Sequence, residues 1–289
     1  WATELMSGIS YLFFLRYLLD RIENNWDEVR KALDEMRFML VHKNGLLLNV
    51  TTEDKLYEQY QREFENFLTL FPARSFKATR WQRAPLPHNE AMLLPAQVNY
   101  VGQAVNLFTS ENNTPSEYRT PIGSSLVGTK FLRTGPLWEK IRVMGGAYGA
   151  FCSFDYFTGV MTFVSYRDPN VLNTLDVFNK AGKFLATNNL SGEEVDRAVI
   201  GTIGDMDSYQ LPDAKGFSSL IRYLTKMDDQ KRQKIRDEIL QTNSKDLQNF
   251  GLDIDQACQE SFVSVMGNKV KIEQAIKDGL KIENVFSVL

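Results

Sequence analysis

Arg142 and Tyr148 stand six residues apart, on either side of a glycine-rich bend, and both are candidate ligand-binding side chains. An arginine carries a permanent charge and a fork of N–H donors, and a tyrosine carries a phenolic donor. Glycines between them would let the backbone approach a ligand closely. Such a pair could hold a peptide carbonyl or a developing oxyanion. The other candidate binding residues are those of the bend itself: Gly145, Gly146, Ala147 and Gly149.

These residues also have purely structural explanations. A cation in the last turn of a helix, the position expected for Arg142, is stabilised by the helix dipole. Gly145 suits the C-terminal cap of a helix, and Tyr148 suits a strand. The bend is not a phosphate loop, because a helix is expected to enter it and a strand to leave it. Nucleotide-binding loops have the reverse order.

The sequence predicts no metal site. Zinc needs three or four well-placed ligands, and the two histidines, His42 and His88, lie far apart in the chain. Asp205 and Asp207 have the alternate spacing of a calcium loop, but the glycine and the terminal glutamate of that motif are missing. No G-x-S-x-G nucleophile elbow occurs either.

The composition of the 289-residue chain is typical of a globular protein, with 43% hydrophobic residues and a formal net charge of −3. The charge predicts no basic surface, so nucleic acid is not expected as a partner. The apolar stretch at 9–15 is too short to span a membrane. Cys152 and Cys258 cannot form a disulfide framework and are interpreted as buried thiols of a reducing compartment. Because the chain opens on Trp1, we expect a piece of a longer polypeptide.

Apolar residues at helical spacing predict two helices before residue 38 and a third over 54–70, with a short strand at 46–51. These elements cannot close a sheet, so residues 1–73 are interpreted as the C-terminal part of a preceding α/β unit. Residues 74–90 are rich in arginine and proline and are predicted to be a linker. Residues 91–289 are predicted to form a complete further unit.

In this further unit the candidate site lies between a predicted helix at 136–144 and a hairpin that turns around Thr158-Gly159. A strand region is predicted over 91–108. Helices are expected to start at three prolines, Pro121, Pro136 and Pro169. The hairpin strands are expected to share a face made of Tyr148, Ala150, Cys152 and Phe154 on one strand and Val160, Thr162, Val164 and Tyr166 on the other.

The remaining elements are a helix that begins with a capping box at Ser191 and Glu194, charged helices over 213–241, a strand at 262–266, a helix at 270–277 and a last strand near Ile282. Strands and helices mix without strict βαβ alternation. This pattern predicts an α+β fold, with a largely antiparallel sheet and helices packed on one face.

Six segments follow one another in the order known from one enzyme family: SYLFFL (10–15), NGLLLNVT (44–51), QVNYVG (97–102), RVMGGAYGAF (142–151), YRDPN (166–170) and GTIGDMDSYQLPDAKG (201–216). Together they resemble the presequence proteases, the organellar members of the pitrilysin-type zinc metallopeptidases (inverzincins), and most of all their plant or green-algal forms. The likeness spans nearly the whole chain. It implies the C-terminal end of such an enzyme, namely the last part of the third of four related units and the complete fourth unit.

The resemblance implies two halves that enclose a chamber. In the family the N-terminal half binds zinc through an H-x-x-E-H motif, which is missing here, so zinc is expected only in the full-length enzyme and this segment alone is expected to be inactive. The family's C-terminal half sends an arginine and a tyrosine, six residues apart, towards the scissile bond. Arg142 and Tyr148 match that spacing and motif, which implies that they position the peptide and stabilise the tetrahedral intermediate.

The implied partners are the N-terminal half of the same polypeptide and unfolded peptides, including cleaved targeting sequences. No membrane partner is expected. The implied location is the mitochondrial matrix, the chloroplast stroma or both. An alternative interpretation is a catalytically inactive, stand-alone peptide-binding or scaffold module with the same fold.

Overall fold

The computed structural model describes residues 2–75, 89–108 and 120–289. The chain divides into two compact units. One, the helical unit, comprises residues 1–86 and 209–226, and the other, the sheet unit, comprises residues 87–208 and 227–289. Most of the predicted linker at 74–90 lies outside the described residues, as does His88, and the predicted domain boundaries stay predictions. In the described part of the chain, no helix has both the length and the apolar character needed to cross a bilayer.

The helical unit contains the helices predicted near its start. They are α2 (Ile9–Asn24), α3 (Trp26–Leu40) and α4 (Asp54–Thr69), accompanied by α1 (Ala2–Ser7), the 3-10 turn η1 (Lys43–Gly45) and α8 (Pro212–Leu224). The strand predicted at 46–51 is wrong, because these residues pair with no strand of the described chain. A β-rich sequence becomes a strand only when another strand pairs with it. Here Asn49 instead donates from its side-chain nitrogen to the carbonyl oxygen of Gly216, at 3.2 Å.

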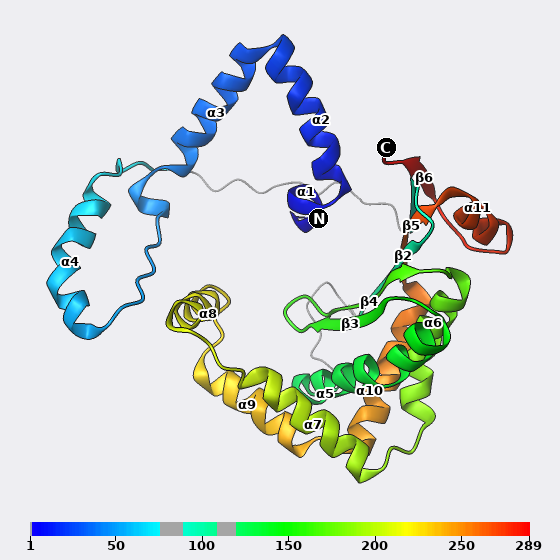
Figure 1. Cartoon of the computed structure of the whole chain (residues 1–289). Coiled ribbons are helices and arrows are strands. Elements are labelled where there is room, and N and C mark those ends of the chain that lie inside the picture. The colour runs from blue at the N-terminus through cyan, green and yellow to red at the C-terminus, as the bar shows by residue number, and fades with distance from the viewer. Residues whose placement is uncertain (1, 76–88, 109–119) are drawn as a thin grey trace. The chain divides into compact units, whose positions relative to one another are not determined.

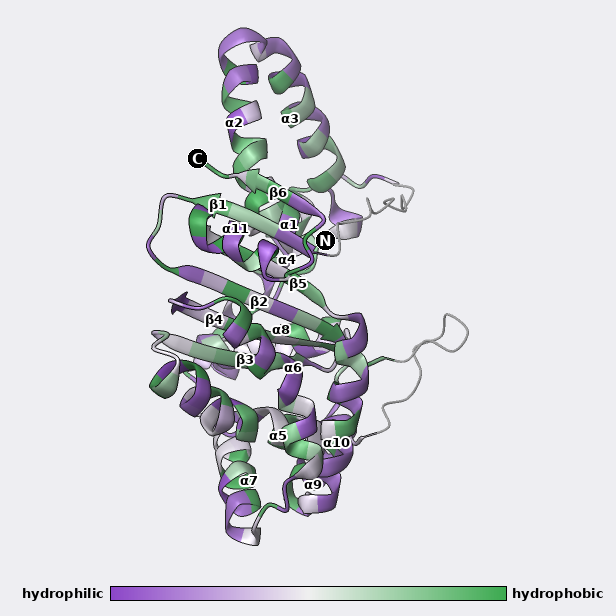
Figure 2. Ribbon diagram, turned by 90° about the vertical axis from the view of Figure 1, so that its right-hand side faces the viewer, coloured by the Kyte–Doolittle hydropathy of each residue, from purple (hydrophilic) through white to green (hydrophobic). Residues whose placement is uncertain are grey.

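The sheet unit is built on six strands in the order β3-β4-β2-β5-β1-β6. Figure 2 shows most of them lying side by side. Their bounds are β1 (Asn89–Leu94), β2 (Asn99–Asn106), β3 (Gly149–Asp155), β4 (Val160–Asp168), β5 (Phe262–Asn268) and β6 (Asn284–Ser287). Neighbouring strands are antiparallel in the pairs β3–β4, β4–β2 and β2–β5. Strand β1 runs parallel to both of its neighbours, β5 and β6. The predicted α+β class with a mostly antiparallel sheet is confirmed.

Helices α5, α6 and α10 pack beside β2 and β3 and cover one face of the sheet (Figure 1). The helices of this unit are α5 (Ile122–Thr134), the π-helix η2 (Trp138–Met144), α6 (Leu172–Thr187), α7 (Gly192–Met206), α9 (Asp229–Gln241), α10 (Ser244–Ala257), the 3-10 turn η3 (Cys258–Glu260) and α11 (Lys269–Lys277). The capping box of Ser191 and Glu194 at the start of α7 is confirmed. The sequence interpretation missed α10, although its Phe250 is 1% exposed and belongs to the core.

The core lies between the sheet and these helices, where the rings of Phe163 and Phe178 stack with centroids 5.4 Å apart. Helices α6 and α10 approach so closely that a Cβ at Gly251 would meet the backbone nitrogen of Ala186. This contact explains the glycine at position 251, because any larger side chain would push the two helices apart.

The hairpin of β3 and β4 is confirmed, but the predicted assignment of its faces is wrong. Cys152 pairs with Phe163, and both side chains are buried on the helix-covered face. Thr162, Val164 and Tyr166 therefore lie on the opposite, open face. The loop at 156–159 sets this register, and a shift by one residue exchanges the faces of a strand.

The helix expected to start at Pro169 is also displaced. Asp168 closes β4, its carboxylate accepts a hydrogen bond from the backbone of Asn170 at 2.8 Å, and α6 begins only at Leu172. The Asp168 side chain closes a turn before the helix, and Val171 is the residue that precedes α6.

Candidate functional site

The helix that carries Arg142 is η2, a π-helix where the sequence predicted a helix of ordinary type. Its buried Ile141 anchors it in the core. It ends where the backbone nitrogens of Gly146 and Ala147 donate to the carbonyl oxygens of Arg142 and Ile141, both at 3.1 Å. Gly146 has φ +80°, a conformation that glycine adopts without strain. The bend thus turns the chain from η2 into β3.

Arg142 and Tyr148 converge across this bend. The guanidinium carbon of Arg142 lies 5.8 Å from the centroid of the Tyr148 ring. Arg142 is half-buried, and Tyr148 is 65% exposed. Among the described residues, neither the guanidinium of Arg142 nor the hydroxyl of Tyr148 has a hydrogen-bond or ion-pair partner. Both polar groups therefore keep unused hydrogen-bond donors beside the bend.

Tyr148 is the end of a row of three tyrosines, which we call the tyrosine row. Its ring meets that of Tyr166 edge to face at 5.9 Å, and Tyr166 meets Tyr100 in the same way at 5.3 Å. The backbone nitrogen of Tyr148 also donates to the carbonyl oxygen of Tyr166 at 3.1 Å. Tyr100 and Tyr166 belong to the open face of the sheet, so the row connects the bend to that face.

Asn170 ties the bend to the end of β4. Its side-chain nitrogen donates to the carbonyl oxygen of Gly145 at 2.7 Å. The turn that holds Asn170 is fixed by Asp168, which is fully buried and whose other carboxylate oxygen accepts from the hydroxyl of Thr174 at 2.7 Å. The sequence interpretation did not assign this role. The Asp-Pro-Asn turn signal could have pointed to it, but the distant acceptor could not be found without the fold.

The four bend residues predicted to bind a ligand differ in exposure. Gly146 is exposed and Gly145 is half-buried, whereas Ala147 and Gly149 are buried. Gly149 is the first residue of β3 and pairs with Tyr166. Exposure at the bend is therefore concentrated at Gly145 and Gly146, next to Arg142.

The acidic residues considered for calcium form ion pairs instead. Asp205 lies 2.9 Å from Lys130 and 3.2 Å from Arg133, and the hydrogen bond from Lys130 is the main cause of its lowered pKa. Asp207 pairs with Arg236, which lowers the pKa of that carboxyl in the same way. No three His, Cys, Asp or Glu side chains of the described residues gather into a set that could hold a metal ion.

His42 and the two cysteines lie in surroundings that suit a structural role and not a catalytic one. The ring nitrogen Nδ1 of His42 accepts a hydrogen bond from the backbone of Gly45 at 3.0 Å. Burial raises the pKa of Cys152 to about 12 and that of Cys258 to about 11. Thiols that stay protonated at neutral pH are poor nucleophiles, so neither cysteine is a candidate catalytic group.

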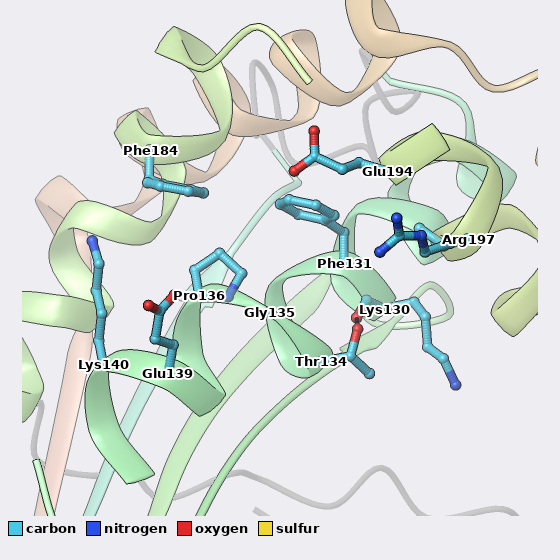
Figure 3. Close-up of a pocket in the computed structure, with 11 residues that line it drawn as sticks. Lys130, Phe131, Thr134, Gly135, Pro136, Glu139, Lys140, Phe184, Glu194 and Arg197 are labelled. Atoms are coloured by element: carbon cyan, nitrogen blue, oxygen red, sulfur yellow. Dashed lines mark hydrogen bonds between the residues drawn. The ribbon is translucent and has the colours of Figure 1, made fainter. Parts of the chain in front are cut away.

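A separate pocket of about 370 Å³ lies among α5, η2, α6 and α7. Figure 3 shows the side chains of Lys140 and Glu139 from η2 and Phe184 from α6 around it. The ammonium of Lys140 lies 4.9 Å from the centroid of the Phe184 ring. Neither Arg142 nor Tyr148 lines this pocket, so it is distinct from the bend.

Solved structures with this fold include peptidase domains. The peptidase M16 inactive domain from Pseudomonas fluorescens has a TM-score of 0.51 and 11% identity, and the match covers 72% of this chain and 51% of that chain. Pitrilysin has a TM-score of 0.51 and 15% identity, with 82% of this chain and 25% of that chain covered. These likenesses define the fold as that of an M16 peptidase unit.

The family follows from the sequence comparisons. The model of the PreP C-terminal domain matches residues 89–269, and this chain belongs to that family. Presequence protease 1, chloroplastic/mitochondrial, of Arabidopsis thaliana is 42% identical over 257 residues, which are 88% of this chain and 23% of that protein. The mitochondrial presequence protease of Emericella nidulans is 28% identical over 254 residues, 86% of this chain and 23% of that protein. The chain thus spans about a quarter of the length of these relatives, and the expected kinship with presequence proteases is confirmed.

Proposed function

We propose that this chain is the C-terminal part, without zinc, of a presequence-degrading metalloendopeptidase. It would close the peptide chamber and position unfolded peptides, including cleaved targeting sequences, for hydrolysis. The observation that carries this proposal is the convergence of Arg142 and Tyr148 on one surface of a chain that belongs to the PreP C-terminal domain family. Organellar location, in mitochondria or chloroplasts, is part of the proposal and is supported by the names of the relatives.

The roles of the two side chains follow from their donors. The guanidinium of Arg142 would donate to a carbonyl oxygen of the bound peptide and offset the negative charge that grows there in the transition state. The hydroxyl of Tyr148 would donate a second hydrogen bond to the same group or its neighbour. Half-buried Gly145 and exposed Gly146 would let the peptide backbone lie close to both donors.

The described residues offer no ligand set that fits zinc. We therefore place the zinc ion and the general base in the N-terminal half of the longer protein, outside this chain. The residues of this chain would bind and position the peptide and offset the charge that develops on it. This division explains why the chain is expected to be inactive without that partner half.

A reconstitution experiment tests the proposal. The chain is mixed with the N-terminal half and zinc, and cleavage of a presequence peptide is followed for the original chain, Arg142→Ala and Tyr148→Phe. We expect no turnover from the chain alone, turnover after mixing, and a loss of about 100-fold in kcat for Arg142→Ala. Tyr148→Phe should lose about 10-fold, because it removes one neutral hydrogen bond.

Matched controls are Arg197→Ala and Tyr223→Phe, which remove an exposed guanidinium and an exposed hydroxyl elsewhere. Both should keep normal rates. Normal rates for Arg142→Ala and Tyr148→Phe would refute the site, and full turnover without the partner half would refute the division of roles. Peptide binding without any turnover after mixing would favour the inactive binding module.

A further inference from the structure

Of the two aromatic rings beside the guanidinium of Arg142, the nearer one belongs to a residue that the sequence interpretation did not consider. Its guanidinium carbon lies 3.9 Å from the centroid of the Trp138 ring, compared with 5.8 Å for Tyr148. Trp138 opens η2 and stands four residues before Arg142, so the two side chains meet on the same face of the helix. We propose that Trp138 is a positioning residue that orients Arg142 for ligand binding. This inference rests on the proposed function of the same site.

The geometry lets Arg142 be held without using its donors. A guanidinium is planar, and its five N–H groups point outward in that plane. Stacking on an indole engages the flat face and leaves the edge free. An ion pair would orient Arg142 too, but it would occupy the same N–H groups that a peptide carbonyl needs. No such ion pair of Arg142 exists within the described chain.

The backbone beneath Trp138 is fixed, so the indole can serve as a rigid support. Leu137 and Ile141, on either side of it in sequence, are buried in the core. The far end of η2 is held by the hydrogen bond from Asn170 to Gly145. Trp138 itself is 41% exposed, which means that its replacement should leave the core intact. Pre-organisation of this kind lowers the entropy lost when the arginine binds.

The first test measures the orientation of Arg142 in the chain alone. The Nε–Hε resonance of Arg142 is assigned by its loss in Arg142→Lys and is then recorded in Trp138→Leu and Trp138→Phe. Above an indole face this proton should be shifted upfield by the ring current. We expect the shift to disappear in Trp138→Leu and to be partly kept in Trp138→Phe, which retains a π face. An unchanged resonance in Trp138→Leu would overturn the inference.

The second test is a double-mutant cycle in the enzyme reconstituted from both halves. Trp138→Leu should lower kcat by about fivefold, since a partly exposed cation–π contact is weak, and Trp138→Phe should recover part of that loss. In the Arg142→Ala background, Trp138→Leu should cost nothing further. An equal loss in both backgrounds would mean a merely structural role and would overturn the inference. Trp26→Leu, at an exposed tryptophan of α3, is the matched control and should keep full activity.

The two proposals fail in distinguishable ways. If Arg142→Ala leaves turnover unchanged while the Nε–Hε resonance responds to Trp138→Leu, the proposed function fails and the orientation of Arg142 by Trp138 stands. If Arg142→Ala abolishes turnover and the resonance ignores Trp138→Leu, the proposed function stands and the orienting role is refuted.

Discussion

The helical unit and the sheet unit both carry amphipathic helices, but within the described residues the sheet unit buries far more of their apolar side chains. Helices α2 and α4 contain no buried residue, and Phe14, Tyr17 and Leu19 of α2 are about half exposed. In the sheet unit, α6 and α10 bury Phe178, Phe250 and their neighbours completely. Figure 2 shows hydrophobic residues on α2 and α3 as well as along the strands.

An apolar stripe along a helix therefore predicts the helix itself but not the residues that will cover the stripe. Most helical stability in proteins comes from packing of the apolar face. The sheet unit provides that packing through residues distant in sequence, such as Phe163 of β4 against Phe178 of α6. The apolar side chains of α2 find no such cover within the described residues.

The largest expected difference is in the free energy of unfolding lost when a core phenylalanine or an exposed phenylalanine is replaced by alanine. Phe250→Ala should lower the free energy of unfolding by about 3–5 kcal/mol, because it leaves a cavity between α10 and the rest of the core. Phe14→Ala, in the helical unit, should change it by about 0.5 kcal/mol or less. Urea unfolding followed by circular dichroism measures both values. Equal losses would mean that α2 is packed as firmly as α10.

The next effect concerns two glycines inside helices of the sheet unit. Gly251→Ala should cost about 1–3 kcal/mol, because its Cβ would press on the backbone of α6. Gly204 in α7 has no atom within 4 Å of a built Cβ. Gly204→Ala should therefore stabilise the protein by about 0.5–1 kcal/mol through the helix propensity of alanine. Thermal unfolding of the two variants should shift Tm in opposite directions, and a shift of the same sign would contradict the packing argument.

The residues that cap helices in the two units should differ less in their contribution to stability. Ser191 accepts from the backbone of Glu194, which in turn accepts from the backbone of Ser191, whereas Glu53 before α4 forms no side-chain cap. Ser191→Ala should cost about 1 kcal/mol. Glu53→Ala should have almost no effect on the unfolding transition, and a comparable loss there would show that the start of α4 is held in a way that its cap does not reveal.

The smallest expected effect is the pH dependence of Asp205. Its pKa is lowered in the folded state by Lys130 and Arg133, so it contributes stability above its unfolded pKa, and this contribution is lost as the pH falls through the folded pKa. Because the carboxyl is 59% exposed, Asp205→Asn should cost less than about 1 kcal/mol at pH 7. The difference between the two proteins should vanish in strong acid. A stability difference that persists in strong acid would mean that packing, and not the charge of Asp205, causes it.

Much of the sheet unit was predictable from local signals. The hairpin turn at Gly159, the capping box at Ser191 and the helix before Gly145 were each found because neighbouring residues specify them. The wrong and the missed elements are those whose structure depends on residues distant in sequence. The strand predicted at 46–51 finds no pairing strand within the described residues, and the helix α10 was missed although its Phe250 and Ile254 belong to the core.

For the candidate site, the sequence by itself determined the chemistry: a guanidinium and a phenol six residues apart around glycines. Its six family segments also determined the kinship. Only the folded chain shows that Tyr166 of β4 contacts Tyr148 and that Asn170 holds the bend through Gly145. The physical reason is that residue types and short spacings fix which donors exist. Their direction depends on strand register and on contacts between segments that only the folded chain brings together.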